Sequence, residues 1–189
     1  MECYKEWAEA QLEKARVKMA WVSEKNRQRI PYTTDENGNY DDRADESREW
    51  SLDDGLNWWT NGFWGGIMWL LYQDTKDPKY MEIARFSERK LGKCFQDFYG
   101  LHHDVGFMFQ PTAVADYRLT GDRDARRIAM HAANLLAGRF NPAGRFIRAW
   151  NEVGDSDTRG WAIIDCMFNI SLLYWASEES GDPRFRQIA

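Results

Sequence analysis

The chain has 189 residues, of which 43% are hydrophobic and 15% aromatic, and its formal net charge at pH 7 is -5. This length and composition allow one sizeable hydrophobic core and exclude a disordered chain. The negative charge, together with the lack of any Lys/Arg run, argues against binding to nucleic acid or to a membrane surface. We therefore expect neither among the partners of this protein.

The cysteines and the N-terminus indicate a compartment. Cys3, Cys94 and Cys166 lie far apart and form no CxxC pair, which fits free thiols in a reducing environment better than a disulfide framework. The N-terminus is charged from its second residue, and no window approaches 18 uncharged apolar residues. The expected location is the cytoplasm.

Helical periodicity runs through most of the sequence. It predicts a first helix over about 4–28, a long polar loop over 29–57, and further helices over about 60–73, 78–98, 111–119, 123–137 and 161–178. Strand-like alternation is scarce, and 141–161 predicts a turn, a short extended piece and a polar loop. The predicted fold class is all-α.

Three segments repeat one pattern: an apolar helix ends, the chain turns at an aspartate, and a new helix reaches Ile-Ala. The turning residues are Asp77, Asp122 and Asp182, each a candidate N-cap, and Pro follows two of them at the first helical position. A repeated helix-turn-helix indicates an α/α array, either an open solenoid or a closed ring. The last copy holds only about seven helical residues before Ala189, so we expect the array to continue beyond this chain.

The segment "WAIIDCMFNI" places Asp165 inside an otherwise apolar predicted helix. An ionised carboxylate removed from water costs several kcal/mol or more unless it is paired, hydrogen-bonded or shifted in pKa. One interpretation is structural, with Asn169 four residues on as the compensating donor. The other is chemical, because burial raises the pKa of a carboxyl toward that of a proton donor at neutral pH.

A second candidate, Asp104, lies in "LHHDVGFMFQP", beside His103 and ahead of a predicted helix. It is either the N-cap of that helix or a carboxylate at the mouth of a cleft. If Asp104 and Asp165 face one cavity, their pKa values should separate and leave one acid protonated and the other charged.

Tryptophans offer flat surfaces on which a sugar ring can stack. In "NWWTNGFWGGIMWLLY", Trp59 is the better cleft candidate, whereas Trp64 and Trp69 are expected in the core, where the Gly-Gly pair permits close helix packing. Trp150 is a second stacking candidate. "HHD" lacks the spacing of a metal motif, and no phosphate-binding glycine loop or GxSxG elbow occurs, so we expect no metal and no cofactor.

The motifs "WTNGFWGG", "HHDVGFMF", "RLTGD", "RFNPAGRFIRAW" and "WAIIDCMFNISLLYWASEESGDPRF" occur in this order. Together they resemble the unsaturated glucuronyl hydrolases, glycoside hydrolase family 88. The resemblance implies an (α/α)6 barrel of six helical hairpins, of which 1–189 would form about the N-terminal half as a single domain. The missing C-terminal half would then be a partner of this chain.

The resemblance also implies a reaction. Asp165 would be the general acid/base, and Asp104, its essential partner, would stay charged and steer the proton to Asp165. The residues contacting the substrate would be Trp59, His103, Trp150 and Asn169. Asp165 would protonate C4 of an unsaturated uronic acid at the end of a lyase-generated oligosaccharide, and water would add at C5. The competing hypotheses are an unsaturated rhamnogalacturonyl hydrolase and a carbohydrate-binding or assembly fragment without catalytic activity.

Overall fold

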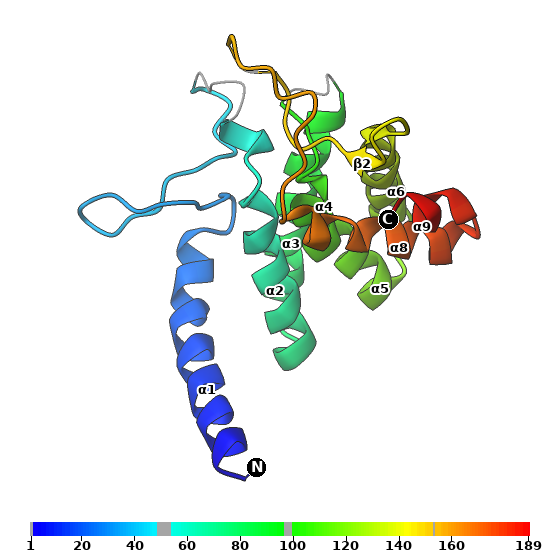
Figure 1. Ribbon diagram of the computed structural model, residues 1–189. Helices are drawn as coiled ribbons and strands as arrows, with labels where there is room; N and C mark the ends of the chain where they lie inside the picture. Colours follow the sequence, from blue (N-terminus) through cyan, green and yellow to red (C-terminus); the bar gives the residue numbers. More distant parts are fainter. Residues whose placement is uncertain (1, 49–53, 97–99, 153) are drawn as a thin grey trace.

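The computed structural model describes residues 2–48, 54–96, 100–152 and 154–189 (Figure 1). The described residues are mainly helical, which confirms the all-α prediction. In these ranges no helix combines the length and the apolarity needed to cross a bilayer. The chain packs its helices in two layers and places its long connecting segments at one end of them (Figure 1).

In chain order the helices are α1 (Glu2–Lys25), α2 (Asn61–Thr75), α3 (Pro78–Gly92), α4 (Val105–Phe109), α5 (Ala115–Thr120), α6 (Arg123–Gly138), α7 (Cys166–Asn169), α8 (Ser171–Ser180) and α9 (Pro183–Ile188). The 3-10 helices are η1 (Gly55–Asn57) and η2 (Lys93–Phe95), and a π-helical turn, η3 (Gln110–Val114), joins α4 to α5. Two short strands, β1 (Phe140–Asn141) and β2 (Phe146–Ile147), pair antiparallel.

Most predicted helices lie within a few residues of their observed bounds, but two predictions were wrong. The helix predicted over 111–119 begins six residues earlier, at Val105, and passes through Pro111 as the π-turn η3. A widened turn accommodates a proline that would otherwise clash with the preceding turn and lacks an N–H to donate. The helix predicted over 161–178 begins only at Cys166. The predicted end of the 78–98 helix lies outside the described residues.

The three turning aspartates are confirmed as helix caps. The Asp77 carboxylate accepts from the backbone N–H of Lys79, that of Asp122 from two N–H groups, and that of Asp182 from the N–H of Arg184. Each cap therefore satisfies backbone donors that the first turn of a helix leaves free. The hairpins α2–α3, α5–α6 and α8–α9 follow from this repeated turn.

One layer contains α2, the α4–η3–α5 helix and α7–α8, and the other contains α3, α6 and α9. The glycines of α2 allow the close approach of α4 and η3 (Figure 1). A Cβ at Gly62 would lie 2.3 Å from the Phe107 carbonyl oxygen, and one at Gly66 would lie 2.8 Å from Pro111 Cβ. Trp64 and Trp69 are buried, as the sequence predicted.

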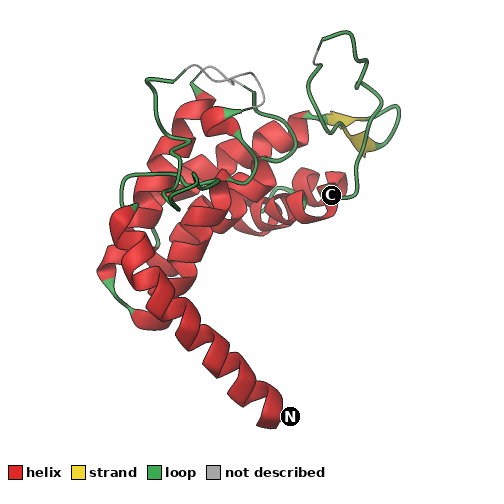
Figure 2. Ribbon diagram, turned by 90° about the vertical axis from the view of Figure 1, so that its left-hand side faces the viewer, coloured by secondary structure: helices red, strands yellow, loops and turns green. Residues whose placement is uncertain are grey.

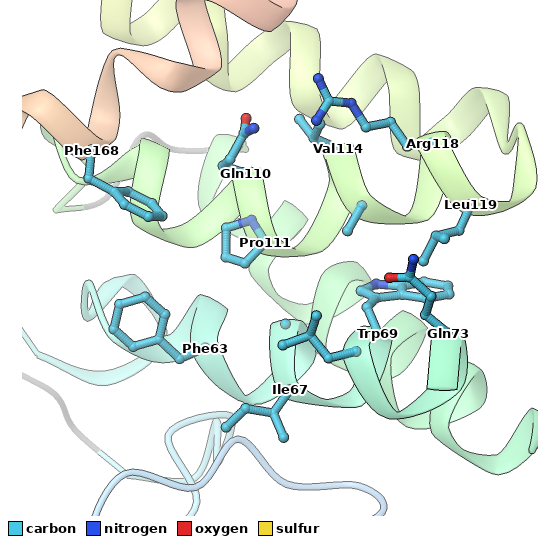
Figure 3. A pocket seen from close by; sticks show the side chains of 13 residues that line it. Phe63, Ile67, Trp69, Gln73, Gln110, Pro111, Val114, Arg118, Leu119 and Phe168 are labelled. Carbon is cyan, nitrogen blue, oxygen red and sulfur yellow. The ribbon is translucent and has the colours of Figure 1, made fainter. Parts of the chain in front are cut away.

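A row of apolar side chains on the first layer is exposed. It comprises Ile67, Leu70, Leu119, Ile164, Met167, Phe168 and Tyr174. A groove of about 790 Å³ runs between α2 and the η3–α5 segment and ends at Phe168 (Figure 3). The N-terminal part of α1 extends beyond the packed layers (Figures 1 and 2), while its C-terminal part contacts α2 and α3 through buried Val22 and the ion pair of Arg16 with Asp74. Exposed apolar side chains that adjoin a groove are typical of a surface that binds another molecule or another part of a protein.

Candidate active site

The first candidate acid, Asp104, is a buried residue at the N-cap position of α4. Its side chain makes no capping hydrogen bond. Instead, Asn169 Nδ2 donates to its Oδ1 over 3.1 Å. The capping interpretation is therefore wrong for Asp104, whose carboxylate is held by a residue 65 positions away.

The second acid, Asp165, occupies the N-cap position of α7 and also makes no capping hydrogen bond. Its side chain is 35% exposed, so the prediction of a carboxylate inside a buried helix is wrong. The apolar residues before it do not form a helical face, since Ile164 is 86% exposed and Trp161 is 50% exposed. One carboxylate oxygen, Oδ1, is nonetheless buried without a hydrogen-bond partner in the described part of the chain.

His103 brings the two acids together. Its Nε2 lies 3.2 Å from Asp104 Oδ1 and 3.5 Å from Asp165 Oδ1, although neither contact has the alignment of a hydrogen bond. The imidazole is fully buried, and burial, reinforced by the positive charge of Arg139, lowers its pKa to about 4. At neutral pH a neutral imidazole therefore separates two carboxyl groups.

Asn169 positions this arrangement. Its amide oxygen accepts from the backbone N–H of Phe107 over 2.8 Å, and its Nδ2 donates to the Asp104 carboxylate and to the backbone oxygen of Asp165. The prediction that Asn169 donates to the side chain of Asp165 is wrong. Asn169 is fully buried, and its hydrogen bonds tie α4 to α7.

The pKa values of the two acids are both raised. Burial, with the nearby charge of Asp165, raises the pKa of Asp104 to about 7. Burial also raises the pKa of Asp165, yet Asp165 keeps more contact with water. The resemblance implied Asp165 as the protonated acid and Asp104 as the charged one, whereas the structure buries Asp104 more deeply and raises its pKa to about 7.

Aromatic rings adjoin the acids on the side of α2. Phe107 stacks on Phe168 with ring centroids 4.7 Å apart, and each ring lies three residues after one of the acids. Trp59 packs on Phe107 at 5.3 Å and on Phe63 at 5.8 Å. We call Trp59, Phe63, Phe107 and Phe168 the aromatic cluster.

Trp150 lies on the other connection near the acids. It is half-buried and packs on Trp161, with ring centroids 5.6 Å apart. Its neighbour Ala149 accepts a hydrogen bond from the backbone N–H of His103. The structure thus places both predicted stacking residues, Trp59 and Trp150, next to segments that carry the acids.

One group in the described residues has ligand atoms close enough for a metal ion. His102, His103 and Asp104 offer atoms within 4.8 Å of one another. Burial lowers the pKa of His102 to about 3, so both imidazoles are neutral. His103 Nε2 lies 3.2 Å from Asp104 Oδ1 and 3.5 Å from Asp165 Oδ1. We therefore interpret this group as two carboxyls placed around a neutral imidazole.

Sequence reasoning missed two features of the site. The stacking of Phe107 on Phe168 has a signal in hindsight, because an aromatic residue follows each acid at helical spacing. Arg139 is the first residue of the motif "RFNPAGRFIRAW", but the motif does not show its role, because its partners lie 9 to 12 positions away in an irregular segment. Only the fold brings Arg139 beside the acid-bearing segments.

Comparisons with known proteins show what this chain resembles. No protein-family model matches the chain. The unsaturated glucuronyl hydrolase of Bacillus sp. (strain GL1) is 40% identical over 152 residues, which are 77% of this chain and 39% of that protein. The unsaturated chondroitin disaccharide hydrolase of Streptococcus agalactiae is 40% identical over 136 residues, 69% of this chain and 33% of that protein.

The solved structures agree. The crystal structure of unsaturated glucuronyl hydrolase from Streptococcus agalactiae superposes with a TM-score of 0.78 at 33% identity, covering 96% of this chain and 43% of that one. The resemblance to the unsaturated glucuronyl hydrolases is confirmed. The helical hairpins correspond to part of the (α/α)6 barrel of these hydrolases.

The chain spans about two fifths of the Bacillus glucuronyl hydrolase and one third of the streptococcal one. The groove of Figure 3 is lined in part by the exposed apolar row, through Ile67, Leu119 and Phe168. The two acids and the imidazole between them all belong to this chain.

Proposed function

We propose that this chain carries the catalytic acid pair of an unsaturated glucuronyl hydrolase. The reaction hydrates the C4=C5 double bond of the unsaturated uronic acid that ends a lyase-generated oligosaccharide. The observation that carries the proposal is the placement of Asp104 and Asp165 on either side of His103 Nε2, within 3.2 and 3.5 Å of it. Two carboxyls with raised pKa values beside an aromatic cluster suit proton transfer to a sugar.

Asp165 is the acid that can reach the substrate, because its side chain is the more exposed of the two. It donates a proton to C4, positive charge develops at C5 and on the ring oxygen, and water then adds at C5. The hemiketal that results collapses and releases the neighbouring sugar. Asp165, left as a carboxylate after the first step, accepts the proton of the incoming water.

Asp104 serves as the partner that sets the protonation of Asp165. With a pKa of about 7, Asp104 is half protonated at neutral pH. A sugar bound over Asp165 removes that carboxyl from water and raises its pKa further, which favours the proton on the carboxyl that faces the substrate. An ionised Asp104 nearby then strengthens this preference.

The substrate proposed is a glycosaminoglycan fragment of chondroitin type, since the streptococcal relative is named for a chondroitin disaccharide. Trp59 and Trp150 form the walls on which the sugar rings stack, and the carboxylate of the uronic acid is bound by groups outside this chain. We propose that the C-terminal half of the barrel supplies them and covers the exposed apolar row. We also propose a cytoplasmic location, because the three cysteines are scattered along the sequence and form no CxxC pair.

The test incubates the 189-residue chain, and separately the complete product of its gene, with unsaturated chondroitin and hyaluronan disaccharides. Loss of the absorbance of the double bond reports the reaction. Asp165→Asn should lower the rate by roughly 10²–10⁴-fold while sugar binding persists. The control variant Asp182→Asn, at a helix cap, should retain most of the wild-type rate.

Other outcomes would reject the proposal. Sugar binding by the complete product without any loss of absorbance would indicate a binding module. Faster turnover of an unsaturated galacturonyl-rhamnose end would indicate a rhamnogalacturonyl hydrolase. An Asp165→Asn protein with unchanged turnover would remove Asp165 from the mechanism.

A further inference from the structure

We infer that Arg139 is a positioning residue of the acid pair: it holds the two acid-bearing segments together and lends its positive charge to Asp104. The inference rests on the proposed function, because it concerns the same two acids. Arg139 is the residue directly after α6, and neither the sequence motifs nor the predicted site gave it a role.

The guanidinium of Arg139 holds one irregular segment at three points. Nε donates to the backbone oxygen of Arg148 over 2.8 Å, one terminal nitrogen donates to that of Ala149 over 3.1 Å, and the other donates to Asn151 Oδ1 over 2.9 Å. The backbone oxygen of Arg139 also accepts from the N–H of Arg148. A segment without regular secondary structure is thereby fixed by one side chain.

The segment that Arg139 fixes joins both acids. Ala149 is fully buried, its oxygen accepts from the backbone N–H of His103, and its N–H donates to the oxygen of Trp161, four residues before Asp165. Asn151 Nδ2 donates to the oxygen of Leu101, three residues before Asp104. Movement of this segment would therefore change the separation of the two carboxyls.

Arg139 also acts by charge. Among the described residues its guanidinium makes no ion pair, and all three of its hydrogen-bond acceptors are neutral. Burial, and next to it the charge of Arg148, lowers its pKa to about 10, so Arg139 is a cation at neutral pH. That charge lowers the pKa of Asp104 and opposes protonation of His102 and His103.

Other groups act on Asp104 from the elements around it. They are His102 and His103 on its own segment, Asp165, the Cys166 thiol and the Asn169 amide. Asp165 raises the pKa of Asp104, while Asn169 and Arg139 lower it. Loss of the Arg139 charge should therefore shift Asp104 toward its protonated form.

The experiment compares Arg139→Gln, Arg139→Lys and Asn151→Ala with the control Arg127→Gln. Arg127 lies on the same helix α6, but it is exposed and forms an ion pair with Asp124 three residues before it. NMR titration of the Asp104 carboxyl carbon in the 189-residue chain is the first readout, and the pH profile of kcat/KM in the complete gene product is the second.

Arg139→Gln should raise the titration midpoint of Asp104 by roughly 0.5–1 pH unit and move the acid limb of the rate profile in the same direction. Arg139→Lys keeps the charge, so the midpoint should stay within about 0.3 unit while the maximal rate falls several-fold. Asn151→Ala should lower the rate without moving the midpoint. Arg127→Gln should change neither.

An unchanged midpoint in Arg139→Gln would overturn the role of the charge. If that variant does not fold, unchanged maximal rates in both Arg139→Lys and Asn151→Ala would overturn the positioning role. The carboxyl titration needs no turnover, so it tests the inference even where the wild-type protein is inactive. If the complete wild-type gene product is inactive but the Asp104 midpoint shifts in Arg139→Gln, the proposed function is rejected and the role of Arg139 stands.

Discussion

In the part of the chain that the structure describes, five aspartates stand at the N-cap positions of α-helices, and they divide into two groups. Asp77, Asp122 and Asp182 accept hydrogen bonds from the backbone of the helices that they begin. Asp104 and Asp165 make no such bond. The same residue type at the same local position therefore serves either the helix or another purpose, and the partners from distant parts of the chain decide which.

The difference has an electrostatic consequence. Hydrogen bonds from Arg184, first from its side chain and then from its backbone, lower the pKa of Asp182. Burial raises the pKa of Asp104 and of Asp165. A capping carboxylate is ionised and stabilises its helix, whereas the two acids of the site hold a proton closer to neutral pH, where a proton donor is useful.

The largest expected effect comes from the contact between α4 and α7, the helices that begin at the two site acids. A Cβ on Gly106, in α4, would lie 2.4 Å from Asn169 Cα in α7, so Gly106→Ala must push these helices apart. We expect a loss of about 2–3 kcal/mol in the free energy of unfolding, measured by urea denaturation. The control is Gly138→Ala, where a Cβ meets nothing within 4 Å, and equal losses in both variants would contradict the account.

A third buried carboxyl, outside the site, separates burial from function. Glu88 in α3 is buried with one oxygen unpartnered, and burial, followed by the charges of Asp116 and Asp122, raises its pKa to about 8. Because this pKa lies above the value in the unfolded chain, the stability that protonated Glu88 provides is complete below about pH 4.5 and is lost as the pH rises through about 8.

Glu88→Gln removes the free-energy cost of ionising a buried carboxyl at high pH. We expect no difference in Tm from the wild type at pH 4, and a gain on the order of 2 kcal/mol above pH 8, with turnover unchanged. Thermal unfolding at several pH values measures it. A stability difference that does not grow with pH would show that Glu88 ionises normally in the folded protein.

Removal of a cap should affect stability alone. The Asp122 carboxylate accepts from the N–H groups of Asp124 and Ala125 at the start of α6, so Asp122→Ala should cost about 1 kcal/mol. Asp122→Asn, which retains an acceptor oxygen, should recover most of it. A large loss of turnover in a folded Asp122→Ala protein would contradict the assignment of Asp122 to the capping aspartates.

The smallest expected effect concerns the residues that precede the caps. Lys76, Gly121 and Gly181 have φ values of 60°, 76° and 72°, and only the lysine bears the steric cost of the left-handed region. Lys76→Gly should therefore raise the free energy of unfolding by roughly 0.5–1 kcal/mol, read from denaturation midpoints. A lowered midpoint would show that the contact of Lys76 with Tyr72 contributes more.

Local chemistry explains what the sequence predicted well. The caps at Asp77, Asp122 and Asp182 depend on residues two or three positions away, and apolar spacing along α2, α3 and α6 determines their buried faces. Such interactions are visible in the order of the residues. The all-α class and the hairpin repeat followed from them.

The rest depends on distant contacts. The partner of the Asp104 carboxylate is 65 positions away. The start of α7 after Asp165 could not be predicted, because the apolar residues 161–164 look like part of a buried helical face but are mostly exposed. Motif resemblance identified both acids, yet which of them is more buried depends on how α4 and α7 meet. Arg139 acts through an irregular segment that no periodicity describes.

The most direct test of the central claim is an NMR titration of the aspartate carboxyl carbons in the 189-residue chain between pH 2 and 9. The account predicts a midpoint near 7 for Asp104, a midpoint above its ordinary value for Asp165, and one below the ordinary value for the capping Asp182. If Asp104 and Asp165 titrate together with Asp182 in the acid range, the two site carboxyls do not share a buried environment and the account is contradicted.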